Sequence, residues 1–438
     1  MNFQPARDAL AAADADGVCA ALAALAALHP RDPELQRLGE MVQFALFGGA
    51  MPPGLKPSTH VFLDNIDRIR RHGTAGPSTG RRFLPRDLDF IADLGGATAW
   101  SLAQSLNHLV MTALEPTRRA AVVGTMRDDG IYILEWVAHY RAIGFEHLFV
   151  YTNDNADGSL DLLSLLARHG VLTLLESEIT GAVPPEAKAF GHAVHLLPEL
   201  RDFAWAAFVD SDEFLVPATR FDYSILHALE ALGRADPDGR IGAILYDWLW
   251  FVSDMVFERQ PGLLLERFQH ARPHWLAKCL VRMRDVLSMR HQHYPELSPG
   301  MTVVDSAFEP VDLATIWERR EAQYAGGRIN HYWPRSFQEF AIKKARGASL
   351  AIAENLYDRP YETFFTWNGR PSPENSFAPD PRLLQAVRQR IDGLRRLDGV
   401  AAAADRIDRD FALVLARVGD EARLRQDYAD NRAEPGSL

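Results

Sequence analysis

The sequence contains few cysteines, no long hydrophobic run and no excess of positive charge. Cys19 and Cys279 are the only cysteines among 438 residues, too few for a disulfide framework or a cysteine-based zinc site. We expect two buried thiols in a reducing compartment. The formal net charge of −11 argues against a broad electropositive surface for nucleic acid, although it leaves room for a local basic pocket that binds one small anion.

The beginning of the sequence also lacks a targeting pattern. MNFQPARDALAAADADG has no basic segment followed by an apolar one, and the most apolar stretch there, Val18–Leu28, is too short to cross a bilayer. We therefore expect a cytoplasmic protein and leave peripheral contact with a membrane open. Hydrophobic residues make up 47% of the chain, which is enough for a large core and more than one domain.

Changes in composition divide the chain into three regions. Residues 1–117 are rich in alanine and leucine, with helix-length segments at 9–28, 33–47 and 98–114. Residues 118–350 alternate between apolar runs and helical spacing. Residues 351–438 return to amphipathic patterns, LLQAVRQRIDGLRRL and IDRDFALVLARV, and predict helices that form a cap or an oligomer contact.

The central region reads as successive strand–helix units. An apolar run from Ala120 leads through RDDG into a helical pattern beginning at Ile133, and the run His147–Tyr151 leads through TNDNADGS into a helix at Leu160–Ala167. A third run covers Val171–Leu175. Units of this length predict a parallel α/β sheet with right-handed connections.

The pattern after the third run predicts further elements. A helix is expected at Pro185–Leu200, followed by the buried strand FAWAAFVD, which ends at Asp210. Two more strands are expected at Ile241–Tyr246 and Leu263–Phe268.

Asp210 and Asp212 form the strongest candidate site. The sequence contains five Asp-x-Asp pairs, at 14/16, 87/89, 210/212, 236/238 and 408/410, but only Asp210 and Asp212 follow a buried strand, where ligands bind to open α/β sheets. Two carboxylates together with phosphate oxygens suit Mn²⁺ or Mg²⁺. The alternative is a solvated acidic turn.

Two other turns follow predicted strands and should face the same crevice. Arg127, Asp128 and Asp129 come after the first strand, and Asn153, Asp154 and Asp157 come after the second. These side chains are candidates for contacts with a nucleotide. Capping of the helices that follow explains them equally well.

The span from Val122 to Gly347 resembles the family-2-like and family-92-like glycosyltransferases in the order of its blocks. TMRDDGIYILEWVAHYRAIGFEHLFVYTNDNADGS is similar to the opening block, FVDSDEFL to the metal motif, DWLWFVSD with PGLLLERF to a donor or acceptor block, and RINHYWPRSFQEFAIKKARG to the last block. The chain differs from the family at Asp128-Asp129, where Asn-Glu is usual, and at Val252, where Gly is usual. The matching positions are Glu135, Trp136, Gly144, Asn153, Asp154, Trp248, Phe251, Ser253, His331, Ser336, Phe340, Lys343, Arg346 and Gly347.

The resemblance implies a GT-A fold, Rossmann-like, in residues 118–350, with helical flanks for acceptor binding or assembly into oligomers. It implies sugar transfer from a nucleotide-sugar donor, UDP-linked, to a glycan acceptor such as a polysaccharide, with inversion at the anomeric carbon. The other interpretations are a catalytically silent carbohydrate-binding or scaffold protein and a nucleotidyltransferase. The last usually has a basic, glycine-rich phosphate loop where this chain has RDDG.

Several single residues then acquire candidate roles. His331 is a candidate third metal ligand, and Lys343 and Arg346 share one helix face, where they could meet a diphosphate, as could Lys278. Each could equally be an ordinary structural or surface residue. His291 and His293 have a spacing that suits zinc, but no third ligand stands out.

Inversion requires a carboxylate that takes the proton from the acceptor hydroxyl. Asp247, directly after a strand-like run, is the first candidate and Asp254 the second, and a structural hydrogen bond explains either residue as well. Trp248, Trp250 and Phe251 could stack on a sugar ring, or could simply be core.

Overall fold

The computed structural model describes residues 80–83, 116–177, 184–298, 300–316, 321–346, 360–368 and 376–432, with a few single positions among the first 28. Apart from those positions, the helices expected at 9–28, 33–47 and 98–114 lie outside the described residues, as do Cys19 and Gly347.

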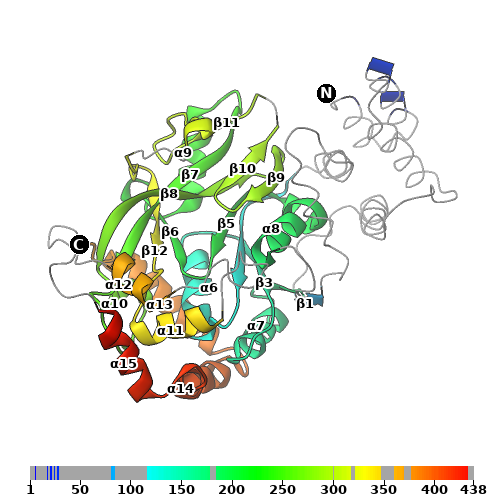
Figure 1. Ribbon diagram of the computed structural model, residues 1–438. Helices are drawn as coiled ribbons and strands as arrows, with labels where there is room; N and C mark the ends of the chain where they lie inside the picture. The colour runs from blue at the N-terminus through cyan, green and yellow to red at the C-terminus, as the bar shows by residue number, and fades with distance from the viewer. Residues whose placement is uncertain are drawn as a thin grey trace.

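A large mixed sheet forms the centre of the molecule (Figure 1). One half is parallel, in the order β1-β4-β3-β2-β5, which confirms the predicted α/β architecture. Strand β1 was not expected, because it comes from the region predicted to be mainly helical. The parallel strands are β1 (Gly80–Phe83), β2 (Arg118–Met126), β3 (His147–Thr152), β4 (Thr173–Glu176) and β5 (Phe203–Asp210).

The other half of the sheet mixes strand directions. Strand β8 runs antiparallel to both β5 and β7, and β12 lies between β7 and β6. Strand β11 pairs with β7, while β9 and β10 form a separate small sheet. These strands are β6 (Glu213–Pro217), β7 (Ile241–Val252), β8 (His270–Arg282), β9 (Val286–His291), β10 (Tyr294–Leu297), β11 (Thr302–Val304) and β12 (Gly327–His331).

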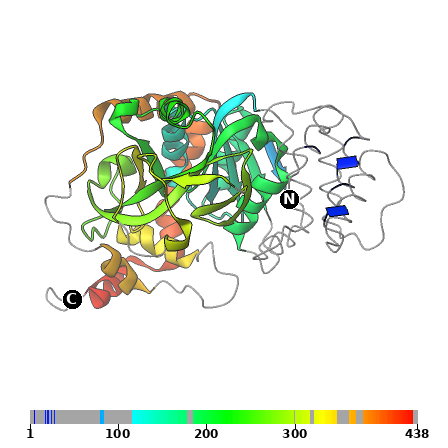
Figure 2. The same ribbon diagram turned by 90° about the horizontal axis from the view of Figure 1, so that it is seen from above.

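Helices cover both faces of the parallel half (Figure 2). The chain moves from β2 to β3 to β4 in one direction and then returns past β2 to β5, so right-handed connections place α6 and α7 on one face and α8 on the other. None of the described helices is long and apolar enough to span a membrane. The helices of this part are α6 (Ile133–Ala142), α7 (Ser159–Arg168), α8 (Pro185–Leu196), α9 (Ile225–Ala235) and α11 (Phe337–Ala345), with short 3-10 turns η2 (Gly130–Tyr132), η3 (Pro198–Asp202), η4 (Thr219–Phe221) and η5 (Leu313–Thr315).

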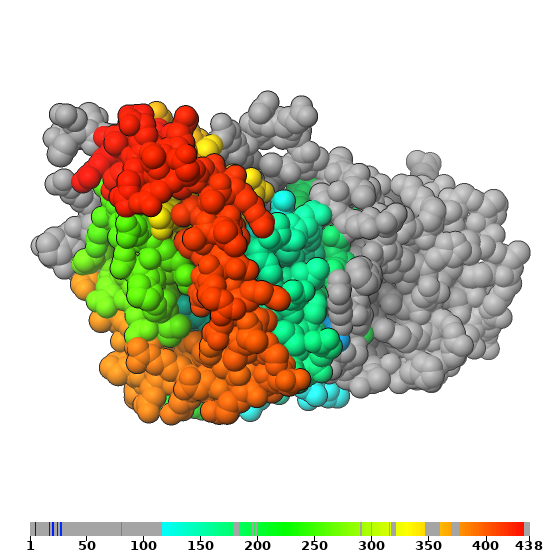
Figure 3. Space-filling model, turned by 90° about the horizontal axis from the view of Figure 1, so that it is seen from below, coloured from blue at the N-terminus to red at the C-terminus, as the bar shows by residue number. Residues whose placement is uncertain are grey.

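The C-terminal helices pack onto the sheet domain and share its core. α13 lies against α6 and α14 against α7 and α11, and Figure 3 shows these orange to red helices spread over this face of the molecule. Val387 and Ile407 belong to the same buried apolar cluster as Val122 and Trp136. The predicted helices of this region therefore pack on the domain that holds the central sheet, while their role as a cap or an oligomer contact stays a prediction. They are α12 (Tyr361–Asn368), α13 (Pro381–Arg395), α14 (Val400–Val418) and α15 (Glu421–Asn431).

The strand predicted at Leu263–Phe268 is wrong, because Leu264–Arg267 forms the short helix α10. Its first amides are held by Glu135, whose carboxylate accepts hydrogen bonds from the backbone N–H of Leu264 at 2.8 Å and of Leu265 at 3.0 Å. Burial raises the pKa of Glu135 to about 7, against the lowering effect of these two hydrogen bonds. A helix of four residues depends on such a tertiary contact, which no local pattern reveals.

Replacing Glu135 with alanine should lower the free energy of unfolding by about 2–3 kcal/mol, because two buried N–H groups lose a carboxylate acceptor. Urea unfolding followed by circular dichroism measures the change. Glu266→Ala, in the same helix, is the matched control, because the Glu266 side chain forms an ion pair with exposed Arg388 and its loss should cost less than about 1 kcal/mol. Equal losses in the two variants would contradict the capping role.

Candidate functional site

The sheet reverses its order of connection between β2 and β5, and this is where an open α/β sheet binds ligands. A cavity of about 250 Å³ lies at the carboxyl ends of these strands. Its wall on this side comes from the last residues of β2, from the end of β3, and from the turn between β5 and β6. The wall residues from these three segments are Thr125, Met126, Arg127, Asp129, Tyr151, Thr152, Asn153, Asp210, Ser211 and Asp212.

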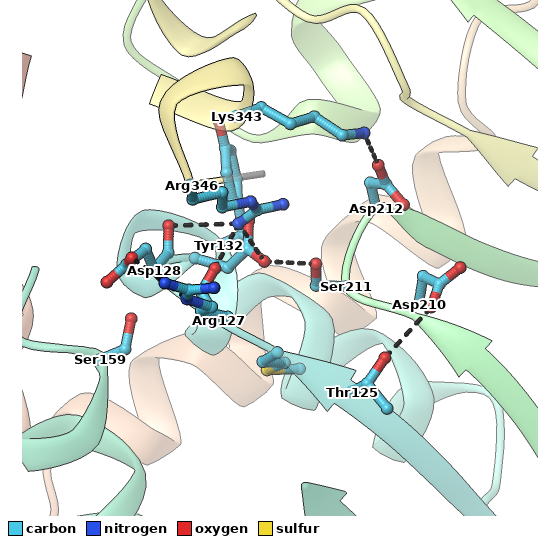
Figure 4. Close-up of polar contacts among 12 residues, drawn as sticks. Thr125, Arg127, Asp128, Tyr132, Ser159, Asp210, Ser211, Asp212, Lys343 and Arg346 are labelled. Carbon is cyan, nitrogen blue, oxygen red and sulfur yellow. Dashed lines mark hydrogen bonds and ion pairs between the residues drawn. The ribbon is translucent and has the colours of Figure 1, made fainter. Parts of the chain in front are cut away.

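Asp210 ends β5 with its carboxylate partly exposed to this cavity. The side chain is 29% exposed and accepts hydrogen bonds from Thr125 Oγ1 at 3.2 Å and from Lys278 Nζ at 3.0 Å (Figure 4). Trp136 Nε1 donates to the Asp210 carbonyl at 3.1 Å and so fixes the backbone of the turn. Lys278 itself is buried behind Asp210 and does not line the cavity, so a direct contact with phosphate is not supported.

Asp212, two residues further on, lies deeper and is surrounded by positive groups. Lys343 Nζ is 2.5 Å from Asp212 Oδ2, His331 Nε2 is 3.5 Å from Oδ1, and an Arg335 nitrogen is 3.9 Å from Oδ2. Although burial raises the pKa of Asp212, the charge of Lys343, then His331, outweighs it and holds the pKa well below the ordinary value. Asp212 is therefore a carboxylate at every pH at which the enzyme would work.

Asp129 joins the loop after β2 to the rest of the site. Its carboxylate accepts a hydrogen bond from Ser211 Oγ at 2.6 Å and pairs with Arg346 at 2.7 Å and with Arg335 at 3.3 Å. Arg346 also donates to the Arg127 carbonyl (Figure 4). Burial raises the pKa of Asp129, but the two arginines lower it further, so the net shift is downward. Asp129 thus links these segments and orients Arg346; both residues line the cavity, so the nucleotide contact by Asp129 stays a prediction.

The turns after β2 and β3 bind each other rather than only facing a ligand. Asp128 Oδ1 accepts from the backbone N–H of Ala156 at 2.6 Å, and Asp157 Oδ2 accepts from the backbone N–H of Gly130 at 2.8 Å. Burial raises the pKa of Asp128. Of the three polar residues predicted after β3, only Asn153 lines the large cavity, since Asp154 is exposed and Asp157 lies beside a smaller one.

Helix α14 holds these two turns from outside. Ile407 lies so close to Gly130 that a Cβ atom there would be 2.9 Å from Ile407 Cγ2, and Gly158, with a φ of +93°, meets the same side chain. Arg417 of α14 donates to the Ala156 carbonyl at 3.0 Å. The C-terminal region therefore positions the loops of the site.

Aromatic rings and a histidine form part of the opposite wall of the cavity. It contains Trp248 from the end of β7, His331 from the end of β12, and Trp333 just after it. The ring of His331 lies 4.2 Å from that of Trp248. Trp248 Nε1 and His331 Nδ1 are buried without a hydrogen-bond partner.

Neither carboxylate predicted as the proton acceptor lines either cavity found in the described residues. Asp247 is fully buried and accepts from the Gln323 backbone N–H at 2.7 Å, because successive residues of β7 point to opposite faces and Trp248 takes the cavity side. Asp254 pairs with His270 at 2.8 Å. The geometry gives structural hydrogen bonds to both.

Three other residues at the cavity were missed as a group: Glu186 from the start of α8, and Gln292 and His293 from the β9–β10 turn. His293 Nδ1 donates to the Ala277 carbonyl at 2.8 Å, since a carbonyl can only accept. The Gln292 amide lies between His293 Nε2, at 3.2 Å, and the Glu186 carboxylate, at 2.6 Å. The HQH sequence drew attention to these histidines as a zinc pair, but in the described residues no group of three or more metal-binding side chains is arranged as a metal site.

The comparison with family models gives a match over residues 127–332 to the model described as glycosyltransferase family 92. The match covers a little under half of the chain and contains Asp210, Asp212 and His331, while Lys343 and Arg346 lie beyond it. Of the two families that the sequence blocks resemble, this is the second. The protein is therefore an enzyme, a glycosyltransferase.

Three structures of S. aureus TarS are similar to the chain at low identity. TarS 1–349 is 11% identical, with a TM-score of 0.27, covering 72% of this chain and 89% of that one. The longer TarS structure is 12% identical, with a TM-score of 0.26, and the match covers 72% of this chain and 54% of that one. TarS 1–349 in complex with UDP is 12% identical, with a TM-score of 0.25, and the match covers 72% of this chain and 89% of that one. None of the curated proteins compared with the chain matches it.

Proposed function

We propose that this glycosyltransferase moves a sugar from a UDP-sugar to a glycan acceptor, with inversion at the anomeric carbon and with a divalent cation at Asp210 and Asp212. The observation that carries the proposal is the convergence of Asp210, Asp212 and His331 with Lys343 and Arg346 on one cavity at the switch point of the sheet. The resemblance of four ordered sequence blocks to glycosyltransferases supports UDP and inversion. RDDG, whose acidic side chains bind backbone and arginines, argues against a nucleotidyltransferase.

The donor atoms present suit Mn²⁺ or Mg²⁺ in kind, although Asp210, Asp212 and His331, like the other described residues, are not arranged as a three-ligand site and would have to reorient around a cation. Asp210 and Asp212 supply carboxylate oxygens, and His331 supplies an imidazole, a set that Mn²⁺ accepts when diphosphate oxygens and water complete it. Burial lowers the pKa of His331 although Asp212 raises it, and the net downward shift favours the neutral ring that a metal ligand needs. When bound, the cation would stabilise the negative charge that develops on the leaving nucleoside diphosphate.

Lys343 and Arg346 supply fixed positive charge beside the carboxylates. Lys343 Nζ lies between Asp212 Oδ2 and the Trp333 carbonyl, 3.3 Å away, at the cavity wall. An incoming diphosphate would attract both side chains, and charge-assisted hydrogen bonds from them would favour the diphosphate as a leaving group.

His293 is the proposed proton acceptor, with Glu186 as its charged partner. The bond to Ala277 holds the proton on Nδ1, and burial, followed by the charge of Lys278, keeps the pKa of His293 well below its ordinary value. The lone pair of Nε2 then faces the Gln292 amide at 3.2 Å, and it becomes available to an acceptor sugar when the N–H group of that amide turns toward Glu186. Once Nε2 takes the acceptor's proton, the Gln292 amide oxygen can accept from it while the amide nitrogen donates to Glu186. In this protonated state, both N–H groups of the His293 ring and the N–H group of the Gln292 amide have an acceptor.

The first test is binding of UDP, GDP and CDP, each with and without Mn²⁺, by calorimetry and thermal shift. We expect UDP to bind, Mn²⁺ to tighten the binding at least about tenfold, and chelation by EDTA to reverse that gain, because two carboxylates facing a diphosphate repel it without a cation. A protein that binds none of the three nucleotides would instead be a silent scaffold. Binding of UDP to the same extent with and without Mn²⁺ would contradict the metal site.

A further inference from the structure

The wall of the cavity continues outward as a row of tryptophans. Trp333 lines the cavity, and its ring lies 5.6 Å from Trp250 and 6.4 Å from Trp367. Trp367, in α12, stacks against Trp250 at 5.2 Å with an interplanar angle of 34°. Three indoles from β7, the segment after β12 and α12 thus lead from the cavity to the surface.

Trp367 is exposed although its backbone is held in place. The residue is 39% exposed and is one of three large hydrophobic residues that are exposed in the described part of the chain, with Leu28 and Leu413. Its carbonyl accepts hydrogen bonds from Trp250 Nε1 at 3.2 Å and from Arg272 at 2.9 Å. These bonds hold the backbone of Trp367, and its ring packs on the buried ring of Trp250, so the side chain loses less conformational entropy on binding a ligand than an unpacked one would.

At the cavity end of this row of tryptophans, two buried polar atoms lack hydrogen-bond partners, which a bound sugar would provide. Trp248 Nε1 and His331 Nδ1 are buried polar atoms without hydrogen bonds, an arrangement that proteins avoid unless a ligand or water completes it. Sugar hydroxyl groups can accept from an indole N–H, and also from the Nδ1–H of His331 when its Nε2 faces a cation, while the C–H face of a sugar packs on indole. Arg272, half buried beside Trp367, offers a further donor to a hydroxyl group.

We propose that Trp333 and Trp367 form a second sugar-binding position, so that the acceptor is an oligosaccharide of at least two sugars with its reacting end at Trp248 and His331. This inference rests on the proposed function for the identity of the reacting end. The exposed ring of Trp367 then binds the sugar that precedes the reacting one. The net charge of −11 favours a neutral glycan over a nucleic acid for this surface.

The test uses the intact protein on an array of immobilised neutral monosaccharides and their di- to hexasaccharides. We expect the wild type to retain oligosaccharides at least about tenfold more strongly than the corresponding monosaccharides, and Trp367→Ala to lose that advantage. Leu413→Ala removes an even more exposed apolar side chain, from α14, and should bind as the wild type does. Unchanged retention by Trp367→Ala, equal retention of monosaccharides, or no retained glycan would each overturn the proposal.

UDP binding with Mn²⁺, measured on the same samples, separates the two proposals. Trp367→Ala should keep the nucleotide affinity of the wild type, because the ring lies outside the cavity that holds Asp210 and Asp212. Nucleotide binding without preference for longer glycans would overturn the second sugar position alone. Preference for longer glycans without nucleotide binding would overturn the transferase mechanism and leave the glycan site standing.

Discussion

Asp210→Asn is expected to lower sugar transfer by about 100- to 1000-fold and to remove the effect of Mn²⁺ on UDP binding, while the protein stays folded. The Asp210 carboxylate is the more exposed of the two at the cavity, so a cation can reach it directly. The substitution leaves Lys278 with Glu186 at 3.4 Å and Glu213 at 3.5 Å, and an amide oxygen can still accept from Thr125. Loss of charge, rather than loss of fold, therefore causes the effect.

Calorimetry of UDP with and without Mn²⁺ and the rate of UDP release from the donor measure this result. Asp238→Asn, in another Asp-x-Asp pair at an exposed turn, is the matched control and should behave as the wild type does. Urea unfolding checks that both variants are folded. A full Mn²⁺ response in Asp210→Asn would contradict the assignment of this residue to the cation.

A substitution of Asp212 tests cation binding less specifically than the sequence alone suggests. From sequence, Asp212→Ala should abolish metal-dependent binding and leave the thermal transition nearly unchanged. In the structure Asp212 is buried among Lys343, Arg335 and His331, and removing one partner of a buried ion pair costs about 3–5 kcal/mol. Loss of binding in that variant would therefore mix lost charge with lost stability.

The sequence predicted strands β2 to β5 of the parallel half well, because long buried runs mark them, whereas β1 was not expected. FAWAAFVD is a strand over its whole length, Phe203–Asp210, and the runs beginning near Ala120 and His147 are β2 and β3. A buried strand needs a continuous apolar run, and such a run is visible locally. Because Asp210 is the last residue of such a run, its position at the end of a strand could be predicted from the sequence.

The sequence could not predict contacts that form between distant segments. Helix α10 depends on Glu135, more than 120 residues earlier, and Asp247 faces away from the cavity because of the pleat of β7 beside Trp248. Asp129 was read as a ligand contact, although Arg335 and Arg346, about 200 residues later, pair with it. The sequence pattern predicts the strand or helix on which a side chain lies, whereas the partner of that side chain depends on how distant segments pack together.

The site residue that the sequence least revealed is His293, and His293→Gln should reduce transfer by about 100- to 10,000-fold with UDP affinity unchanged. Glutamine keeps a hydrogen-bonding side chain but cannot take a proton near neutral pH. Glu186→Gln should cause a smaller loss, because it removes only the charge that stabilises the protonated imidazole through Gln292. His291→Gln, on the same turn but outside the cavity, is the matched control.

The pH dependence of kcat/KM distinguishes a proton acceptor from a residue that only positions the acceptor sugar. The groups facing His293 are Lys278, His291, His331 and, through Gln292, Glu186; burial lowers the pKa of His293 most, and the first three groups lower it further. Since the pKa lies well below 6.5, the wild-type rate should stay level above that pH and fall only as the pH drops through the lowered value. His293→Gln should lose this acidic fall. His291→Gln should keep the rate at neutral pH and move the fall to higher pH, because His291 lowers the pKa of His293, whereas Asp247→Asn should keep both the rate and the profile. An Asp247→Asn variant that binds UDP but transfers no sugar would instead assign the proton to Asp247.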